Sequence, residues 1–133
     1  MSYFLDTNTC IYLLRGLYPS LTDRLLRERP STVKIPAMVL AELYAGSRES
    51  SDPERTKTAI DAFVSAFEIA GFDQKAASSF GDIRSALDRA SVKVGPYDLI
   101  IAATVIAHNG ILVTNNIKEF SRIEGLVVEN WAG

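Results

Sequence analysis

Three acidic residues stand out because each lies where a helix begins or beside an apolar segment: Asp6, Glu42 and Asp98. Asp98 follows a Gly-Pro-Tyr segment in which Pro96 suits the first turn of a helix, because a first-turn residue needs no backbone donor. Residues 99–107 are apolar on nearly every face, which predicts a helix buried between other layers. A carboxylate at the start of such a helix either has a partner or a metal ion, or only complements the helix dipole. This stretch alone leaves both interpretations open.

Asp6 and Glu42 also have ordinary interpretations. Asp6 ends an apolar run at residues 3–5 and could serve only as the N-cap of the helix that follows. Glu42 lies about 60° from the centre of the apolar stripe of its helix, at roughly 100° per residue. At this margin the Glu42 side chain could either line a cleft or be fully exposed to solvent. Because three incidental carboxylates are less expected than one, we interpret the set as a site.

The elements that must position these acids alternate between strands and helices. Strands are predicted at residues 3–5, 32–35, 67–70, 111–114 and 126–129. Helices are predicted at residues 10–14, 20–29, 37–47, 53–67, 74–90 and 96–108, with Gly16 and Asn109-Gly110 as stop signals. This alternation predicts an α/β fold in which helices cover both faces of a parallel sheet. No repeat or linker interrupts it, so we expect residues 1–133 to form one domain.

The predicted topology brings the acids to one edge of the sheet. Open parallel sheets bind ligands at the carboxyl ends of their strands, near a change in strand order. Asp6 ends the first strand, Asn116 follows the fourth, Glu42 lies on the helix after the second, and Asp98 begins the helix before the fourth. Clustered carboxylates take up protons unless a cation keeps them ionised. Oxygen ligands suit Mg²⁺ or Mn²⁺, which can polarise a phosphoryl oxygen and activate a bound water.

Other hydrolytic chemistries lack their residues. The single histidine, His108, falls in the last turn of its helix, where it suits a helix end better than catalysis, so a histidine-pair ribonuclease mechanism is excluded. The chain has no glycine-rich phosphate loop and no serine in a nucleophile elbow. Cys10 is alone, which excludes a disulfide and a thiolate cluster, and we expect it to be buried. Hydrolysis by this chain would therefore depend on metal.

Composition and charge indicate the class of protein, its compartment and its partners. Apolar residues make up 47% and charged residues 23% of 133 residues, which is typical of a globular protein. No apolar run approaches the roughly 20 residues that span a bilayer, and no signal peptide is evident, so we expect a cytoplasmic protein with no membrane partner. The net charge of −2 argues against non-specific coating of nucleic acid but permits a local basic surface. Four basic residues between Arg15 and Arg29 suit either such a surface or a solvated helix face.

Four short motifs, taken in order, resemble a PIN-domain ribonuclease, and more narrowly the VapC-type toxins of prokaryotic toxin–antitoxin pairs. They are Asp6-Thr7-Asn8, Ala41-Glu42-Leu43 with Gly46, Gly95-Pro96-Tyr97-Asp98 before Ile100-Ile101-Ala102, and Val113-Thr114-Asn115-Asn116. A second set resembles the subgroup described as cleaving initiator tRNA: Asn115-Asn116 with Glu119-Phe120, Gly125-Leu126 and Glu129-Asn130-Trp131. The resemblance runs from Tyr3 to Trp131, nearly the whole chain.

The resemblance implies a PIN-like α/β/α sandwich with a five-stranded parallel sheet. It implies an Mg²⁺- or Mn²⁺-dependent endoribonuclease that acts on RNA, and the resemblance to the subgroup implies initiator tRNA as the substrate. It also implies a cognate VapB-like antitoxin and a homodimer. By matching positions, Asp6, Glu42 and Asp98 would be the metal ligands. The helix at residues 53–67 and the first two helices could form the dimer or antitoxin surfaces.

One departure from the family pattern concerns Asn116, where many relatives carry a fourth acid. An amide can coordinate metal or hydrogen-bond a ligand water but adds no charge, so we expect one tightly held ion and a weaker second. Thr114 and Asn116 either orient water or Asp6 or serve ordinary turn chemistry. Glu119 could lean into the site, although we expect a surface role. Arg84 either contacts RNA or flanks the long helix in solvent.

Three other functions compete. A receiver-like signalling module would need an aspartate after the third strand and a lysine after the fifth, and residues 67–71 and 127–129 supply neither. A structure-selective DNA nuclease of the flap-endonuclease type generally carries more acids and insertions than 133 residues allow. A degenerate PIN domain would bind RNA without cleaving it, and the three acids count against this.

Overall fold

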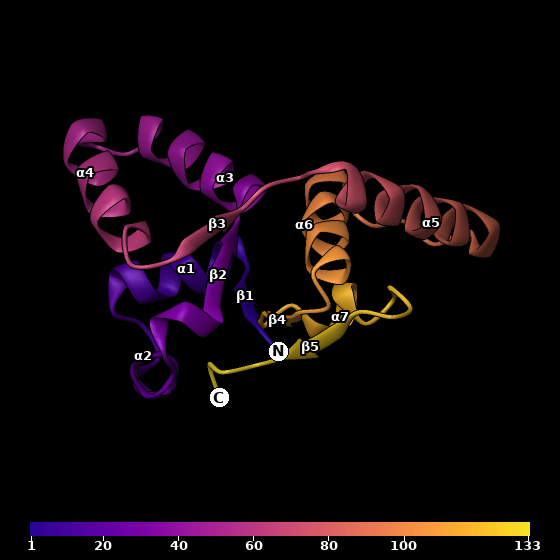
Figure 1. The fold of residues 1–133 in the computed structure, drawn as a ribbon. Helices are drawn as coiled ribbons and strands as arrows, with labels where there is room; N and C mark the ends of the chain where they lie inside the picture. The colour runs from indigo at the N-terminus through magenta and orange to yellow at the C-terminus, as the bar shows by residue number, and fades with distance from the viewer.

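The computed structural model describes residues 1–133, and all of its strands belong to one parallel sheet. The strands are β1 (Tyr3–Leu5), β2 (Val33–Pro36), β3 (Glu68–Ala70), β4 (Ile111–Val113) and β5 (Val127–Glu129). Their order is β3-β2-β1-β4-β5, and Tyr3 of the central strand pairs with both Val33 and Ile111 (Figure 1). The predicted five-stranded parallel sheet is confirmed.

Helices cover both faces of this sheet, as predicted. They are α1 (Thr7–Arg15), α2 (Pro19–Arg27), α3 (Ala37–Arg48), α4 (Pro53–Val64), α5 (Gln74–Ala90), α6 (Pro96–Ala107) and α7 (Ile117–Phe120), with a 3₁₀ turn at Pro30–Thr32. The chain runs from β1 outward to β3, then returns across the sheet to β4 and β5. Because parallel crossovers are right-handed, the outward helices α1 to α4 lie on one side and α5 to α7 on the other (Figure 1).

The core lies around β1 and α6. Phe4, Leu5 and Leu112 are fully buried in the middle of the sheet, and Cys10 on α1 is buried as predicted. Six residues of α6 are buried, which agrees with the prediction of a helix enclosed between layers. No helix is both long and apolar enough to cross a membrane.

Local signals explain where several helices begin and end. Asp6 caps α1 by accepting a 2.8 Å hydrogen bond from the Thr9 amide, and Gly16 ends the helix in the left-handed region with a φ of 68°. After α6, Asn109 takes the left-handed conformation, with a φ of 53°. Gly110 does not share it. A Cβ atom at position 110 would overlap the Phe4 ring, so this glycine is needed for close packing rather than for its φ.

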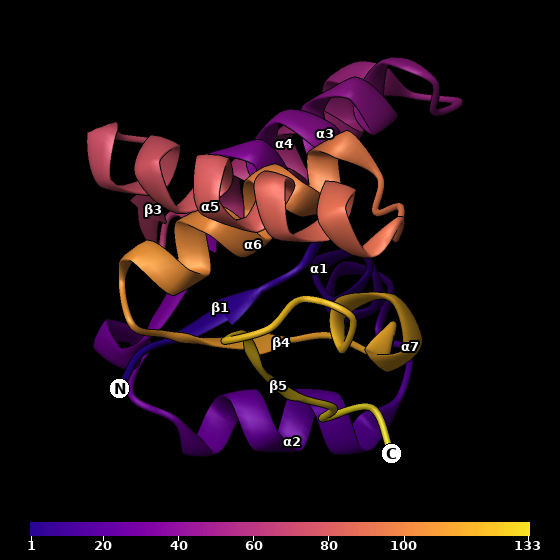
Figure 2. The same cartoon turned by 90° about the vertical axis from the view of Figure 1, so that its right-hand side faces the viewer.

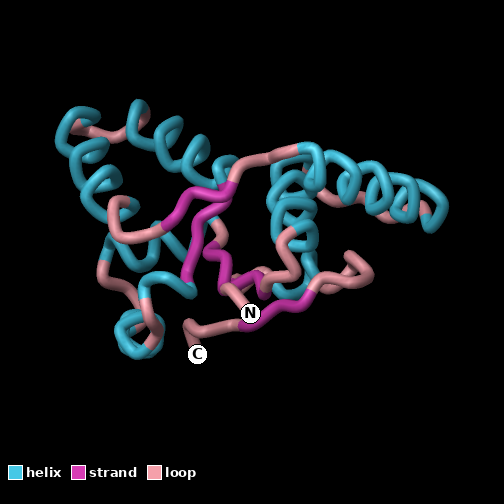
Figure 3. The backbone as a smooth tube through the Cα atoms, viewed as in Figure 1, coloured by secondary structure: helices cyan, strands magenta, loops and turns pink.

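Two predicted helix ends were wrong, and one short helix was missed. The helix predicted at residues 20–29 ends at Arg27, because Pro30 holds the preceding Arg29 extended, with a ψ of 134°. The helix predicted at 53–67 ends at Val64, and residues 65–67 connect it to β3. The short helix α7 was not predicted at all, because four residues are too few to show a helical period. Figure 3 shows how short the strands are beside the helices.

The strand order also excludes the receiver-like signalling module. Receiver domains have the order 2-1-3-4-5, in which the first strand lies between the second and third. Here β1 lies between β2 and β4. The receiver-like interpretation is therefore wrong.

Candidate active site

The candidate site lies where the strand order reverses, at the carboxyl ends of β1 and β4. The chain leaves β1 toward β2 on one side, while β4 and β5 extend the sheet on the other. Asp6 directly follows β1, and Thr114 directly follows β4. Open α/β sheets bind their ligands at this switch point. Figure 2 shows the same edge, with α7 beside the start of α6.

Asp6 is both a helix cap and a site residue. Its side chain is buried, with 5% exposed, and it accepts hydrogen bonds from the Thr9 amide and from the Thr114 hydroxyl, while the Thr9 hydroxyl donates to the Val113 carbonyl at 3.2 Å. Burial raises the pKa of the Asp6 carboxyl, and these hydrogen bonds partly offset the rise. The N-cap interpretation and the site interpretation are thus compatible, because the cap fixes the carboxylate at the strand end.

Glu42 is tied to the same place. Its half-buried side chain on α3 accepts a 2.7 Å hydrogen bond from the hydroxyl of Thr7, the residue after Asp6. The predicted position at the margin of the buried face is therefore confirmed, and the alternative of plain solvent exposure is wrong. The hydrogen bond joins α3 to the first turn of α1, which brings the second acid to the end of β1.

Asp98 is the most perturbed acid of the three. It is half-buried in the first turn of α6, and its pKa is raised to about 7. Burial is the largest cause, followed by the hydrogen bond that the protonated carboxyl donates to Glu119 and by the negative charges of Glu119, Glu42 and Asp6. All the predicted acids therefore lie within electrostatic reach of Asp98.

Glu119 is a fourth acid of this site, and the expected surface role was wrong. It lies half-buried on α7 and accepts hydrogen bonds from the Asn116 amide at 2.9 Å and the Gly95 backbone amide at 3.3 Å. Its pKa is lowered, chiefly because Asp98 donates a hydrogen bond to it. Glu119 lies three residues after Asn116, nearly one helical turn, and this turn brings the two side chains together. The sequence did not reveal this contact, because α7 is too short for its helical period to be recognised.

Thr114 and Asn116 connect the two halves of the site. Thr114 is 1% exposed, hydrogen-bonds Asp6 and accepts a 2.9 Å hydrogen bond from the backbone amide of Asn116. Thr114 therefore orients Asp6, one of the two roles considered for it. The exposed Asn116 side chain holds Glu119, and its contact with metal or water stays a prediction.

Two other candidates lie in ordinary structural roles. Arg84 forms an ion pair with Asp88 at 3.4 Å on the exposed face of α5, so it is a flanking residue. The His108 Nδ1 atom lies 2.8 Å from the Thr104 carbonyl, and its ring packs near Phe4, with the centroids 5.8 Å apart. His108 thus serves the end of α6, as predicted.

The donor atoms of the site suit a hydrated hard cation. All are carboxylate oxygens, and the raised pKa of Asp98 reflects burial and negative charge that a cation would offset. No three acidic, histidine or cysteine side chains are grouped closely enough to ligate one ion together. Mg²⁺ commonly binds one or two carboxylates and keeps several waters. Asp6, Glu42 and Asp98 would hold such an ion either directly or through its waters.

Comparison with known proteins gives one consistent result. The family model described as the PIN domain matches residues 3–126. The chain is 41% identical over 132 residues to "Ribonuclease VapC2" of Rickettsia felis, and 36% identical over 131 residues to "tRNA(fMet)-specific endonuclease VapC" of Salmonella typhimurium, covering 98% of both chains in each case. Among solved structures, VapBC2 from Rickettsia felis, bound to a DNA fragment from its promoter, has a TM-score of 0.92 at 40% identity, covering 98% of this chain and 99% of that chain.

Proposed function

The chain belongs to the PIN-domain family, and from this premise we propose that it is the endoribonuclease toxin of a VapBC-type toxin–antitoxin pair. Its substrate is initiator tRNA, in which it hydrolyses a phosphodiester bond. The observation that carries the proposal is the group of four acids at the switch point, Asp6, Glu42, Asp98 and Glu119. The relative named as a tRNA(fMet)-specific endonuclease supports the choice of substrate, because it matches along 98% of this chain.

In the mechanism, the protein holds its carboxylates in place before RNA arrives. Thr9 and Thr114 orient Asp6, Thr7 orients Glu42, and Glu119 receives the hydrogen bond of Asp98. A bound Mg²⁺ or Mn²⁺ would polarise a phosphoryl oxygen and lower the pKa of a water. Without metal, Asp98 holds its proton up to a pKa of about 7, and a bound cation would favour release of that proton and leave all the site's carboxylates charged.

The proposal extends to the partners and the setting. The solved VapBC2 relative is a toxin–antitoxin complex, which supports a cognate VapB-like antitoxin for this chain. We further propose that residues 1–133 act as one domain, that the toxin is a homodimer and that it works in the cytoplasm. A DNA nuclease of the flap-endonuclease type is not favoured, because the matched relatives are named ribonucleases.

Incubation of the antitoxin-free protein with total tRNA tests this function. We expect discrete fragments with Mg²⁺ or Mn²⁺ and none with EDTA, and sequencing of the fragment ends identifies the cut bond. The variant Asp6→Asn should abolish cleavage and stay folded, because asparagine is as good an N-cap as aspartate. The matched control Asp82→Asn removes an exposed acid on α5 that makes no ion pair, and it should cleave normally.

Two outcomes would contradict the proposal in different ways. Suppose that no tRNA is cut, but Mg²⁺ still raises the melting temperature of the wild-type protein and not that of Asp6→Asn. The metal site would then be supported, and tRNA would be refuted as the substrate. If Mg²⁺ changes neither the cleavage nor the melting temperature, the acids have only structural roles, and their assignment as catalytic residues is refuted.

A further inference from the structure

An anionic RNA strand must approach a site that is itself acidic. Four carboxyl groups gather there, and the whole chain carries a net charge of −2. A metal ion offsets this charge only at the scissile phosphate, so the neighbouring phosphates need cationic side chains close by. Any free basic residues at the edge of the site are therefore candidates for holding the strand.

Three such residues flank Asp98 and Glu119: Lys93, Lys118 and Arg122, which we call the basic rim. Lys93 lies on the loop between α5 and α6, Lys118 on α7, and Arg122 just beyond it. All three side chains are exposed, and none forms an ion pair, since the ion pairs of the structure involve other bases.

Hydrogen bonds hold the rim against the acids. The Arg122 Nη1 atom donates to the Lys93 carbonyl at 3.2 Å, and the Gly95 amide donates to Glu119 at 3.3 Å. The α5–α6 loop and α7 are thus joined at two points, and Figure 2 shows them at the same end of the molecule. The Arg122 charge is close enough to contribute to the low pKa of Glu119, after the larger effect of the Asp98 hydrogen bond.

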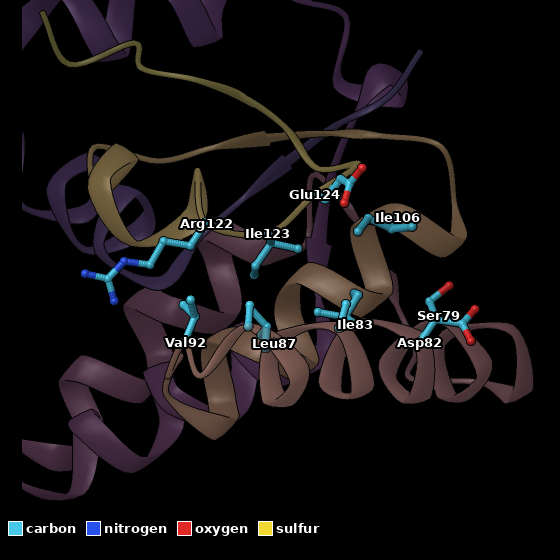
Figure 4. A pocket seen from close by; sticks show the side chains of 11 residues that line it. Ser79, Asp82, Ile83, Leu87, Val92, Ile106, Arg122, Ile123 and Glu124 are labelled. Atoms are coloured by element: carbon cyan, nitrogen blue, oxygen red, sulfur yellow. The ribbon is translucent and has the colours of Figure 1, made fainter.

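The packing beneath the rim leaves Arg122 available. Ile83, Leu87 and Ile123 line an apolar pocket of about 330 Å³ between α5 and the segment after α7. Figure 4 shows Ile123 directed toward Leu87 and Ile83, whereas the Arg122 side chain extends away from them, past Val92. Ile123 therefore anchors the segment, and the neighbouring guanidinium faces outward.

We propose that the basic rim binds the RNA backbone on one side of the scissile bond, with the side chains of Lys93, Lys118 and Arg122 contacting phosphates. This inference rests on the proposed function, because it takes RNA as the substrate. It assigns the rim to substrate binding rather than to the reaction itself. Loss of these cations should therefore weaken binding and leave the chemical step unchanged.

Steady-state cleavage of tRNA at several salt concentrations tests the rim. The double variant Lys93→Ala/Lys118→Ala should raise KM roughly tenfold at low salt with kcat unchanged, and should reduce the slope of log KM against log salt by about 0.7–0.9 per lost phosphate contact. The matched control Arg48→Ala/Lys75→Ala removes the same charge from exposed, unpaired residues on α3 and α5, and it should change neither value.

Equal effects in the two double variants would overturn the proposal, because only net charge would then matter. It would also be overturned if the rim variant kept its KM but bound the antitoxin more weakly, which would make the rim an antitoxin surface. Direct binding of labelled tRNA to Asp6→Asn separates this inference from the proposed function. Rim-dependent binding without any cleavage by the wild-type protein would support the rim and refute the nuclease.

Discussion

At the scale of residues, the site depends on polar side chains that hold the acids rather than on the acids alone. Thr7, Thr9 and Thr114 each hydrogen-bond a carboxylate of the site. A hydrogen-bond donor favours the ionised form of its acceptor, so the hydrogen bonds from Thr9 and Thr114 both orient Asp6 and oppose the effect of burial on its pKa. Asp98 has an acid as its neighbour instead, and its pKa is raised to about 7.

Removal of the Thr114 hydroxyl should therefore impair activity more than stability. We expect Thr114→Val to lower kcat/KM about 10- to 100-fold, the usual cost of losing a group that orients a metal ligand. Thr114→Ser keeps the hydroxyl and should retain most of the activity. Cleavage rates, with the folded state checked by circular dichroism, would test this, and a loss in Thr114→Ser as large as that in Thr114→Val would contradict the role of the hydroxyl.

The metal-free protein should lose stability as pH rises. Folded Asp98 keeps its proton up to a pKa of about 7, whereas the unfolded chain releases it near the ordinary value of 3.8. The folded state thus binds more protons between these values, and the free energy of unfolding falls as pH increases through this window. The raised pKa of Asp6 acts in the same direction. The lowered pKa of Glu119 matters only in more acidic solution.

Melting temperatures in EDTA, from about pH 5.5 to about pH 8, measure this effect. The wild-type protein should melt progressively lower across this range, and Asp98→Asn should flatten the dependence. The exposed control Asp82→Asn should behave like the wild-type protein. A wild-type melting temperature that does not fall over this range would contradict the assignment of the Asp98 pKa.

At the scale of elements, the site depends on the turn between α6 and β4, which packs closely against β1. The turn passes over the Phe4 ring at Gly110, where a side chain would overlap the aromatic carbons. Phe4 is fully buried in the central strand and cannot move aside without disturbing the core. This close contact lies at the start of β4, which pairs with β1 and ends beside Thr114.

The two glycines at positions 110 and 81 should respond oppositely to alanine. Gly110→Ala should destabilise the protein by about 1–3 kcal/mol through overpacking against Phe4. Gly81 lies within α5 with open space around it, so Gly81→Ala should stabilise the protein by about 0.5–1 kcal/mol. Urea unfolding measures both values, and a neutral Gly110→Ala would show that the turn can relax.

The elements that could be predicted from the sequence are those with local signals. The capping residues after β1, the glycine at position 16 and the apolar run of α6 each determine structure within a few residues. Asp6, Glu42 and Asp98 were found because they interrupt such patterns. Glu119 was assigned to the surface because its environment depends on a four-residue helix and on the loop at Gly95, which lies 24 residues away in the chain.

At the scale of the whole molecule, the C-terminal segment packs against the first strand and α2. Trp131 is 5% exposed, its ring meets Tyr3 edge-on with centroids 5.0 Å apart, and the Arg24 guanidinium lies 4.6 Å from its centroid. The indole N–H donates to Glu129 at 3.0 Å, and Ser20 donates to the Trp131 carbonyl at 3.2 Å. This cluster joins segments from both ends of the chain.

Trp131→Ala should therefore destabilise the whole protein. We expect a loss of about 3–5 kcal/mol, as for other buried aromatic residues, with unfolding still in a single transition. Tyr97→Ala removes an aromatic side chain that is 56% exposed and should change stability by less than about 1 kcal/mol. Chemical denaturation of both variants provides the measurement, and similar small effects would mean that the C-terminal segment is dispensable.

The most direct test of the whole account is the rate at which the antitoxin-free protein cleaves purified initiator tRNA, compared with elongator methionine tRNA under the same conditions. The account predicts metal-dependent cleavage of the initiator at a single bond, little cleavage of the elongator, and no cleavage by a folded Asp98→Asn variant. Cleavage that persists in EDTA or in Asp98→Asn would contradict the assignment of the acids at the switch point as the catalytic site.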